Sequence, residues 1–106
     1  MNEMRFVKPL VLEALKHSQE ARNNDNYMYY LVCRAKLAAR GMDINQISFT
    51  DALLRKDELG IPLFESCRRA RQKIQEVDPD LSATDEVQAM RKVLEAEAKD
   101  FARDNR

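Results

Sequence analysis

The sequence predicts an all-α fold, and three features of composition and patterning point to it. Apolar residues recur at helical spacing in several separate stretches of the 106-residue chain. Only two glycines and three prolines are present, so few turns are available, and they fall between these stretches. No pair of alternating stretches carries the turn residues of a β-hairpin. We therefore expect a single domain, residues 1–106, built as a compact bundle of about five helices without a β-wing.

The first helix is expected over residues 7–16, where an apolar stripe recurs at helical spacing. Its members are Val7, Leu10, Val11, Ala14 and Leu15. The polar residues 18–26 that follow are predicted to form a loop. His17 is the only histidine and lies at the helix end, where a charged imidazole is favourable. A metal-binding or acid–base role for it is the weaker interpretation.

The second helix is expected from a cap at Asn24 or Asp25 to about Arg40, with Gly41 in the left-handed position beyond it. It carries two apolar stripes on nearly opposite sides, and such a helix is usually packed on both faces. The first stripe is Met28, Leu31, Val32, Ala35 and Ala39, and the second is Tyr30, Cys33 and Leu37. We expect this helix to be central and its tyrosines to pack, with base stacking as the alternative.

A shorter helix is expected over residues 49–57, capped by Ser48. Its inward side is expected to hold Phe49, Ala52, Leu53 and the stem of Lys56. A turn at Gly60 and a proline at position 62 then open a basic helix over residues 63–77. Its inner side is expected to hold Leu63, Phe64, Cys67, Ala70, Ile74 and Val77. Residues 48–77 therefore predict a helix-turn-helix pair, whose second member enters the DNA major groove in proteins of that kind.

The last helix is expected over residues 83–103 after the break at Pro79, with a cap at Ser82 or Thr84. Val87, Met90, Leu94 and Phe101 form a roughly heptad stripe, which Glu97 interrupts. The stripe spans about two heptads, fewer than a coiled coil requires. The helix either packs on the domain or supplies the seam of a homodimer.

Charge is balanced overall but not locally. Eighteen basic and eighteen acidic residues give no net charge, which argues against a protein that coats nucleic acid without specificity. Residues 68–73, however, hold four basic side chains and no acidic one. We predict a DNA-binding face, with phosphate contacts added from residues 55 and 56. The proposed DNA-binding residues are Arg68, Arg69, Gln72, Lys73, Arg55 and Lys56.

Two features oppose a purely DNA-binding interpretation. Glu65 and Glu76 lie on the same outer face of the basic helix and would repel DNA. The alternative is a helical protein–protein interaction module, which suits a neutral chain better.

Arg71 falls among the apolar positions by its helical angle, so we expect a structural role, snorkelling or pairing with Asp57 or Glu58.

The sequence lacks the residue sets of common catalytic centres. No Ser or Cys is tied to a histidine base, no Cys and His cluster has zinc-site spacing, and no Gly-rich phosphate loop is present. We expect no enzymatic activity, no metal and no cofactor. The N-terminus lacks the pattern of a secretory signal and no apolar run reaches membrane length. These features predict a cytoplasmic protein without a membrane partner, in which Cys33 and Cys67 are reduced and packed.

Residues 59–75 resemble the helix-turn-helix core of winged-helix and related bacterial regulators. Leu59, Gly60 and Ile61 match the turn, while Ser66 and Cys67 stand where Thr-Val would stand. The chain as a whole is similar to small phage and prophage proteins of Gram-positive bacteria. The matching positions are Pro62, Phe64, Glu65, Arg69, Arg71, Lys73, Ile74 and Gln75. These resemblances imply a regulator or accessory factor, active in transcription regulation, of a phage or other mobile element.

Overall fold

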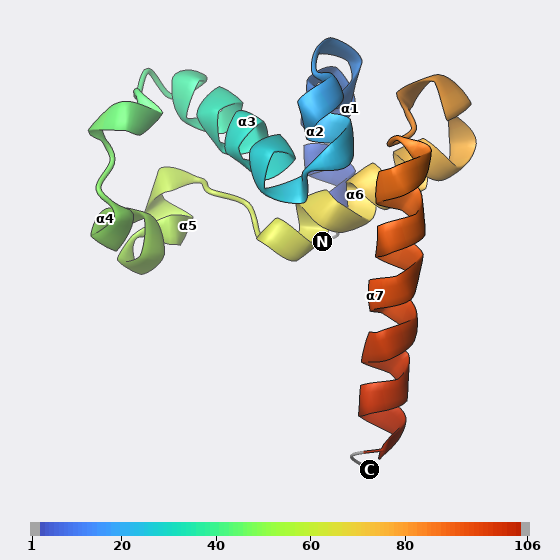
Figure 1. Cartoon of the computed structure of the whole chain (residues 1–106). Helices are drawn as coiled ribbons and strands as arrows, with labels where there is room; N and C mark the ends of the chain where they lie inside the picture. Colours follow the sequence, from blue (N-terminus) through green and yellow to red (C-terminus); the bar gives the residue numbers. More distant parts are fainter. Residues whose placement is uncertain (1–2, 105–106) are drawn as a thin grey trace.

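The computed structural model describes residues 3–104, and side chains as far as Lys99. The all-α prediction is confirmed, since the described residues contain helices and no strand. The α-helices, shown in Figure 1, are α1 (Glu3–His17), α2 (Gln19–Asn23), α3 (Asp25–Ala38), α4 (Phe49–Leu54), α5 (Lys56–Leu59), α6 (Phe64–Val77) and α7 (Asp85–Asp104). Two 3₁₀ turns, η1 (Ile44–Gln46) and η2 (Pro79–Leu81), lie between them.

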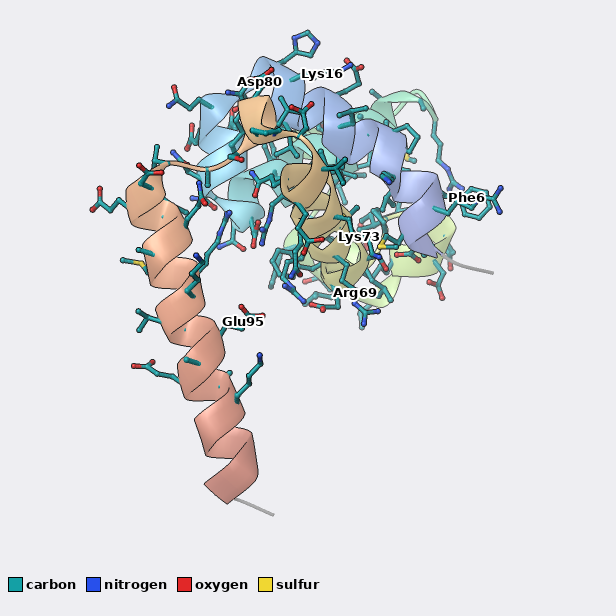
Figure 2. The ribbon with its side chains drawn as sticks, turned by 90° about the vertical axis from the view of Figure 1, so that its right-hand side faces the viewer. Phe6, Lys16, Arg69, Lys73, Asp80 and Glu95 are labelled. Carbon is teal, nitrogen blue, oxygen red and sulfur yellow. The ribbon has the colours of Figure 1, made fainter. Side chains whose placement is uncertain are left out.

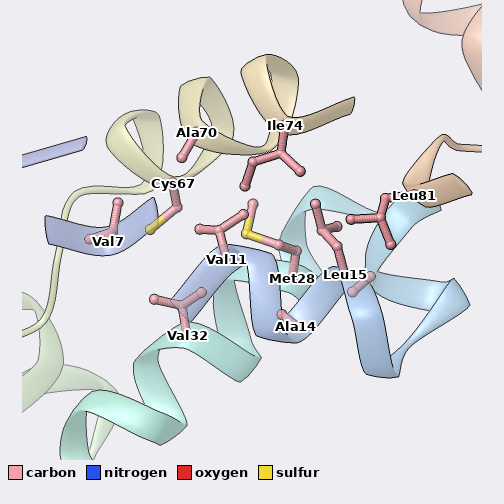
Figure 3. Packing of buried hydrophobic residues seen from close by; sticks show 11 residues of the cluster. Val7, Val11, Ala14, Leu15, Met28, Val32, Cys67, Ala70, Ile74 and Leu81 are labelled. Carbon is pink, nitrogen blue, oxygen red and sulfur yellow. The ribbon is translucent and has the colours of Figure 1, made fainter. Parts of the chain in front are cut away.

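The hydrophobic core lies where α1 packs against α6 and α3, with α2 at one end (Figure 3). Its largest fully buried side chains include Leu15 from α1 and Met28 from α3. Helix α6 contributes Cys67, Ala70 and Ile74, which lie on one side of that helix at helical spacing. The predicted inner side of the basic helix is therefore confirmed over its central turns, and its flanking positions Leu63 and Val77 are exposed.

Helix α3 is apolar on two faces, as predicted. Met28 and Val32 enter the core with α1 and α6, whereas Cys33 and Leu37 are buried on the side that faces η1 and α4. The first stripe is shorter than predicted, because Ala35 and Ala39 are exposed. Only the N-terminal half of the stripe reaches the core cluster.

Local capping sets several helix ends where the sequence predicts them. The side chain of Asn24 accepts a hydrogen bond from the Tyr27 N–H at 3.1 Å and begins α3. Ser48 caps α4 in the same way through the Asp51 N–H at 3.0 Å. Gly41 and Gly60 have φ of 76° and 73°, the left-handed conformation that ends helices α3 and α5 without steric strain.

Several predicted helix limits are wrong. Helix α1 begins at Glu3, four residues before its predicted start, and α3 ends at Ala38, two residues before its predicted end. The predicted loop at residues 18–26 contains helix α2, which is capped by the Ser18 hydroxyl and anchored by the buried side chain of Ala21. The predicted helix at residues 49–57 is two short helices, because Arg55 has the non-helical angles φ −115° and ψ 30°. Helix α4 has no buried residue, so it lacks the tertiary packing that normally sustains helical structure.

The expected inward side of α4 faces α3 but, contrary to the sequence prediction, is not packed against it. Phe49 is 79% exposed and Leu53 is 60% exposed, while Ala52 is partly buried. Figure 1 shows α4 and α5 set apart from α6, to which a non-helical segment, residues 60–63, connects them. The Tyr29 hydroxyl donates to the Pro62 carbonyl at 2.6 Å and ties this segment to α3. The predicted helix-turn-helix pair is not confirmed, because such a pair requires its two helices to adjoin.

Helix α7 projects away from the other helices, as Figures 1 and 2 both show. It begins at Asp85, two residues later than predicted, and the Thr84 hydroxyl accepts from the Val87 N–H at 3.4 Å. All of its side chains are exposed as far as Lys99, apart from Val87 and Arg91, which are partly buried. The side chain of Phe101, the last member of the predicted stripe, lies outside the described residues.

Candidate interaction surfaces

The outer face of α6 carries most of the predicted DNA-binding residues. Because Cys67, Ala70 and Ile74 face the core, Arg69 and Lys73 must point to solvent, and Figure 2 shows both on the surface. Gln72 lies beside Arg69 on the helix and is partly buried. The structure brings these three together around a shallow hollow that Met4, Ser66 and Glu76 also line.

Part of the positive charge on this face is neutralised within the helix. Arg68 donates from Nε and Nη2 to the two carboxylate oxygens of Glu65, at 2.9 and 2.6 Å. Arg69 Nε lies 3.8 Å from the same carboxylate. The hydrogen bond from Arg68 lowers the pKa of Glu65 and raises the pKa of Arg68. An i, i+3 pair of this kind can be read from the sequence, and the DNA-binding prediction overlooked it.

Arg55 and Lys56 lie apart from this face. Arg55 pairs with Glu58 of its own segment, with 3.1 Å between Nε and Oε2. Lys56 lines a groove between α3 and α4. The structure therefore does not join these two residues to the cationic side chains of α6 in one surface (Figure 1).

Arg71 has the structural role that its helical angle predicts, but with a different partner. It is only 7% exposed, and its Nε and Nη2 atoms donate to the two oxygens of Asp25 at 2.8 and 3.0 Å. The expected partners, Asp57 and Glu58, are wrong because the inner side of α6 meets the first turn of α3 rather than α5.

A second arginine reaches the same carboxylate from α7. Arg91 Nη2 lies 3.4 Å from Asp25 Oδ1, and its Nη1 donates to Gln75 Oε1 at 3.3 Å. Burial, together with the charge of Arg71, lowers the pKa of Arg91. Asp25 therefore links α3, α6 and α7. The sequence analysis missed this network, since no spacing relates residues so distant along the chain.

The apolar stripe of α7 is uncovered. Met90 is 61% exposed and Leu94 is 57% exposed, although they lie four residues apart on one side of the helix. Both line an open groove of about 510 Å³ whose opposite wall is the polar segment Asn23–Asn26. An apolar stripe that faces a polar wall gains little from burial there, so this stripe remains available to another molecule.

Neither cysteine is paired with the histidine among the described residues. Both cysteines are unpaired and buried, and burial raises the pKa of each thiol, that of Cys67 to about 12, which keeps the thiols protonated and unreactive. His17 is exposed beside Glu13. No three His, Cys, Asp or Glu side chains gather into a metal-binding group among the described residues.

None of the helices in residues 3–104 is long and apolar enough to cross a membrane.

Comparison with known proteins identified no relative of this chain. No family model matches the sequence, no curated protein matches it, and no solved structure matches the fold.

Proposed function

We propose that this chain is a helical protein–protein interaction module whose contact surface is the apolar stripe of α7. The observation that carries the proposal is the exposure of Met90 and Leu94 on a helix that projects from the body. Amphipathic helices bind partners through apolar side chains at this spacing. The absence of net charge fits a protein partner better than a polyanion.

A second copy of α7 is the simplest partner. Heptad-like spacing lets two such helices pack their stripes against each other. Glu97 interrupts the stripe, so the expected seam is short and the association moderate. The base of each helix would stay attached to its own body through Arg91, which contacts Asp25.

Replacing Met90 and Leu94 together with serine is expected to weaken association strongly. Each side chain would lose part of the roughly 1.5–3 kcal/mol that full burial supplies, so the dissociation constant should rise on the order of a hundredfold. Sedimentation equilibrium over a concentration series measures the mass in solution. Val77→Ser is the matched control, because Val77 is an exposed apolar residue on α6. A wild-type protein that stays monomeric throughout, or association that the double substitution does not weaken, would contradict the proposal.

DNA binding by α6 is the second candidate, because Arg69, Gln72 and Lys73 lie side by side on an accessible face. Replacing Arg69 and Lys73 with alanine should weaken binding to mixed DNA fragments and lower the salt slope by about two units. Electrophoretic mobility at two salt concentrations measures both effects. The control replaces Lys16 and Lys99 with alanine, which removes the same charge elsewhere. An equal loss in both variants would remove α6 from the mechanism. The resemblance to phage and prophage proteins, and the mobile-element origin that it implies, stay a prediction.

A further inference from the structure

A second groove lies between α3 and the segment that contains η1, α4 and α5. Its volume is about 430 Å³, within the range of small-molecule sites. The buried side chains of Cys33 and Leu37 line it from α3, and Phe49 and Leu53 line it from α4. Figure 1 shows the helices that form its two sides. The lining is predominantly apolar, and it includes no acidic side chain among the described residues.

The α4 side of this groove is incompletely packed. Phe49 and Leu53 are four residues apart on one side of the helix, yet most of their surface is exposed. Burial of apolar surface of this kind is favourable, and in the described part of the chain no other segment covers it. A molecule that occupied the groove would contact both of these side chains.

Lys56 gives the groove a single positive charge. Its side chain is partly buried in the groove wall. Within residues 3–99 the Lys56 ammonium has no hydrogen-bond acceptor and no carboxylate partner, although the adjacent Arg55 is paired with Glu58. Cys33 lines the same groove, and the positive charge of Lys56 partly opposes the rise in the pKa of its thiol that burial causes. A partly desolvated cation without a partner favours an anionic ligand group.

We propose that this groove binds a small amphiphilic carboxylate, with its apolar part against Phe49 and Leu53 and its carboxylate on the Lys56 ammonium. The unpaired cation supplies the charge complementarity, and the apolar lining supplies the larger share of the contact surface. The volume suits a small molecule, because it lies within the range of small-molecule sites.

Octanoate and octan-1-ol are the probes that test this assignment. Titration of labelled protein, followed by amide chemical shifts, should give saturable binding of octanoate with shifts around residues 33, 52 and 56. Lys56→Gln should weaken octanoate binding about fivefold and leave octan-1-ol binding unchanged, because only the carboxylate meets the ammonium. Arg55→Gln is the matched control and should bind both probes as the wild type does.

Ala52→Phe should fill the groove and abolish binding of both probes. If this variant loses its helical circular dichroism signal, the smaller substitution Ala52→Leu should have the same effect on binding. The assignment is overturned if octanoate does not saturate, if Lys56→Gln binds it unchanged, or if binding survives in both Ala52 variants. Binding of an acidic amphipathic peptide in place of octanoate would assign the groove to a protein partner and would also overturn it. The variant with serine at positions 90 and 94 should bind octanoate normally, so this test is independent of α7.

Discussion

Replacing Asp25 with alanine is expected to lower the free energy of unfolding by about 4 kcal/mol, the typical effect of removing one partner from a buried ion pair. Arg71 is almost fully buried and holds both oxygens of Asp25, so the variant would leave a desolvated guanidinium without a carboxylate. Arg91 would lose its contact with the same group. Urea denaturation, followed by circular dichroism, measures the change.

Asp85→Ala is the matched control for this prediction. Asp85 occupies the first turn of α7 as Asp25 occupies the first turn of α3, but it is exposed and takes part in none of the ion pairs among the described residues. Its removal should change stability by less than about 1 kcal/mol. The double variant Asp25→Leu with Arg71→Met should regain most of the loss, because it removes both charges together. A loss at Asp25 no larger than that at Asp85 would show that the buried pair contributes nothing.

Replacing Leu15 with alanine is expected to lower the free energy of unfolding by about 3 kcal/mol, the second large effect. Leu15 is fully buried in the core, and Figure 3 shows it between Met28 and Leu81. The loss combines the transfer of apolar atoms to water with the cavity that the close-packed neighbours cannot fill. The midpoint of urea denaturation at low protein concentration measures it.

Leu94→Ala provides the comparison on the same residue type. Leu94 is more than half exposed on α7, so the same truncation should reduce the stability of the monomer by less than about 1 kcal/mol. At high concentration it should weaken association instead, since the stripe of α7 is the proposed contact surface. Similar losses for the two leucines in dilute solution would mean that α7 packs on the body in the unassociated protein.

The positions of the four longest helices and several helix ends follow from short-range features of the sequence. Apolar residues at helical spacing predict α1, α3, α6 and α7, because a helix repeats its faces every three or four residues. Asn24 and Ser48 begin helices through hydrogen bonds to nearby N–H groups, and Gly41 and Gly60 end them through a left-handed backbone. The pairing of Arg68 with Glu65 is equally local, since the two residues lie three apart on one helix.

The sequence by itself determined the helical class, the central part of the inner face of α6 and the position of Arg71 on that face, because periodicity assigns each residue to a side of its own helix. Only the tertiary structure decided what each side meets. Arg71 pairs with Asp25, which lies 46 residues away in the sequence. Phe49 and Leu53 are not covered by another segment of the described chain, and α7 projects from the body instead of packing on it. The physical reason is that an apolar or charged helix face can pack against any complementary face. The connecting segments determine how whole helices are placed, and so they determine which complementary face is in contact.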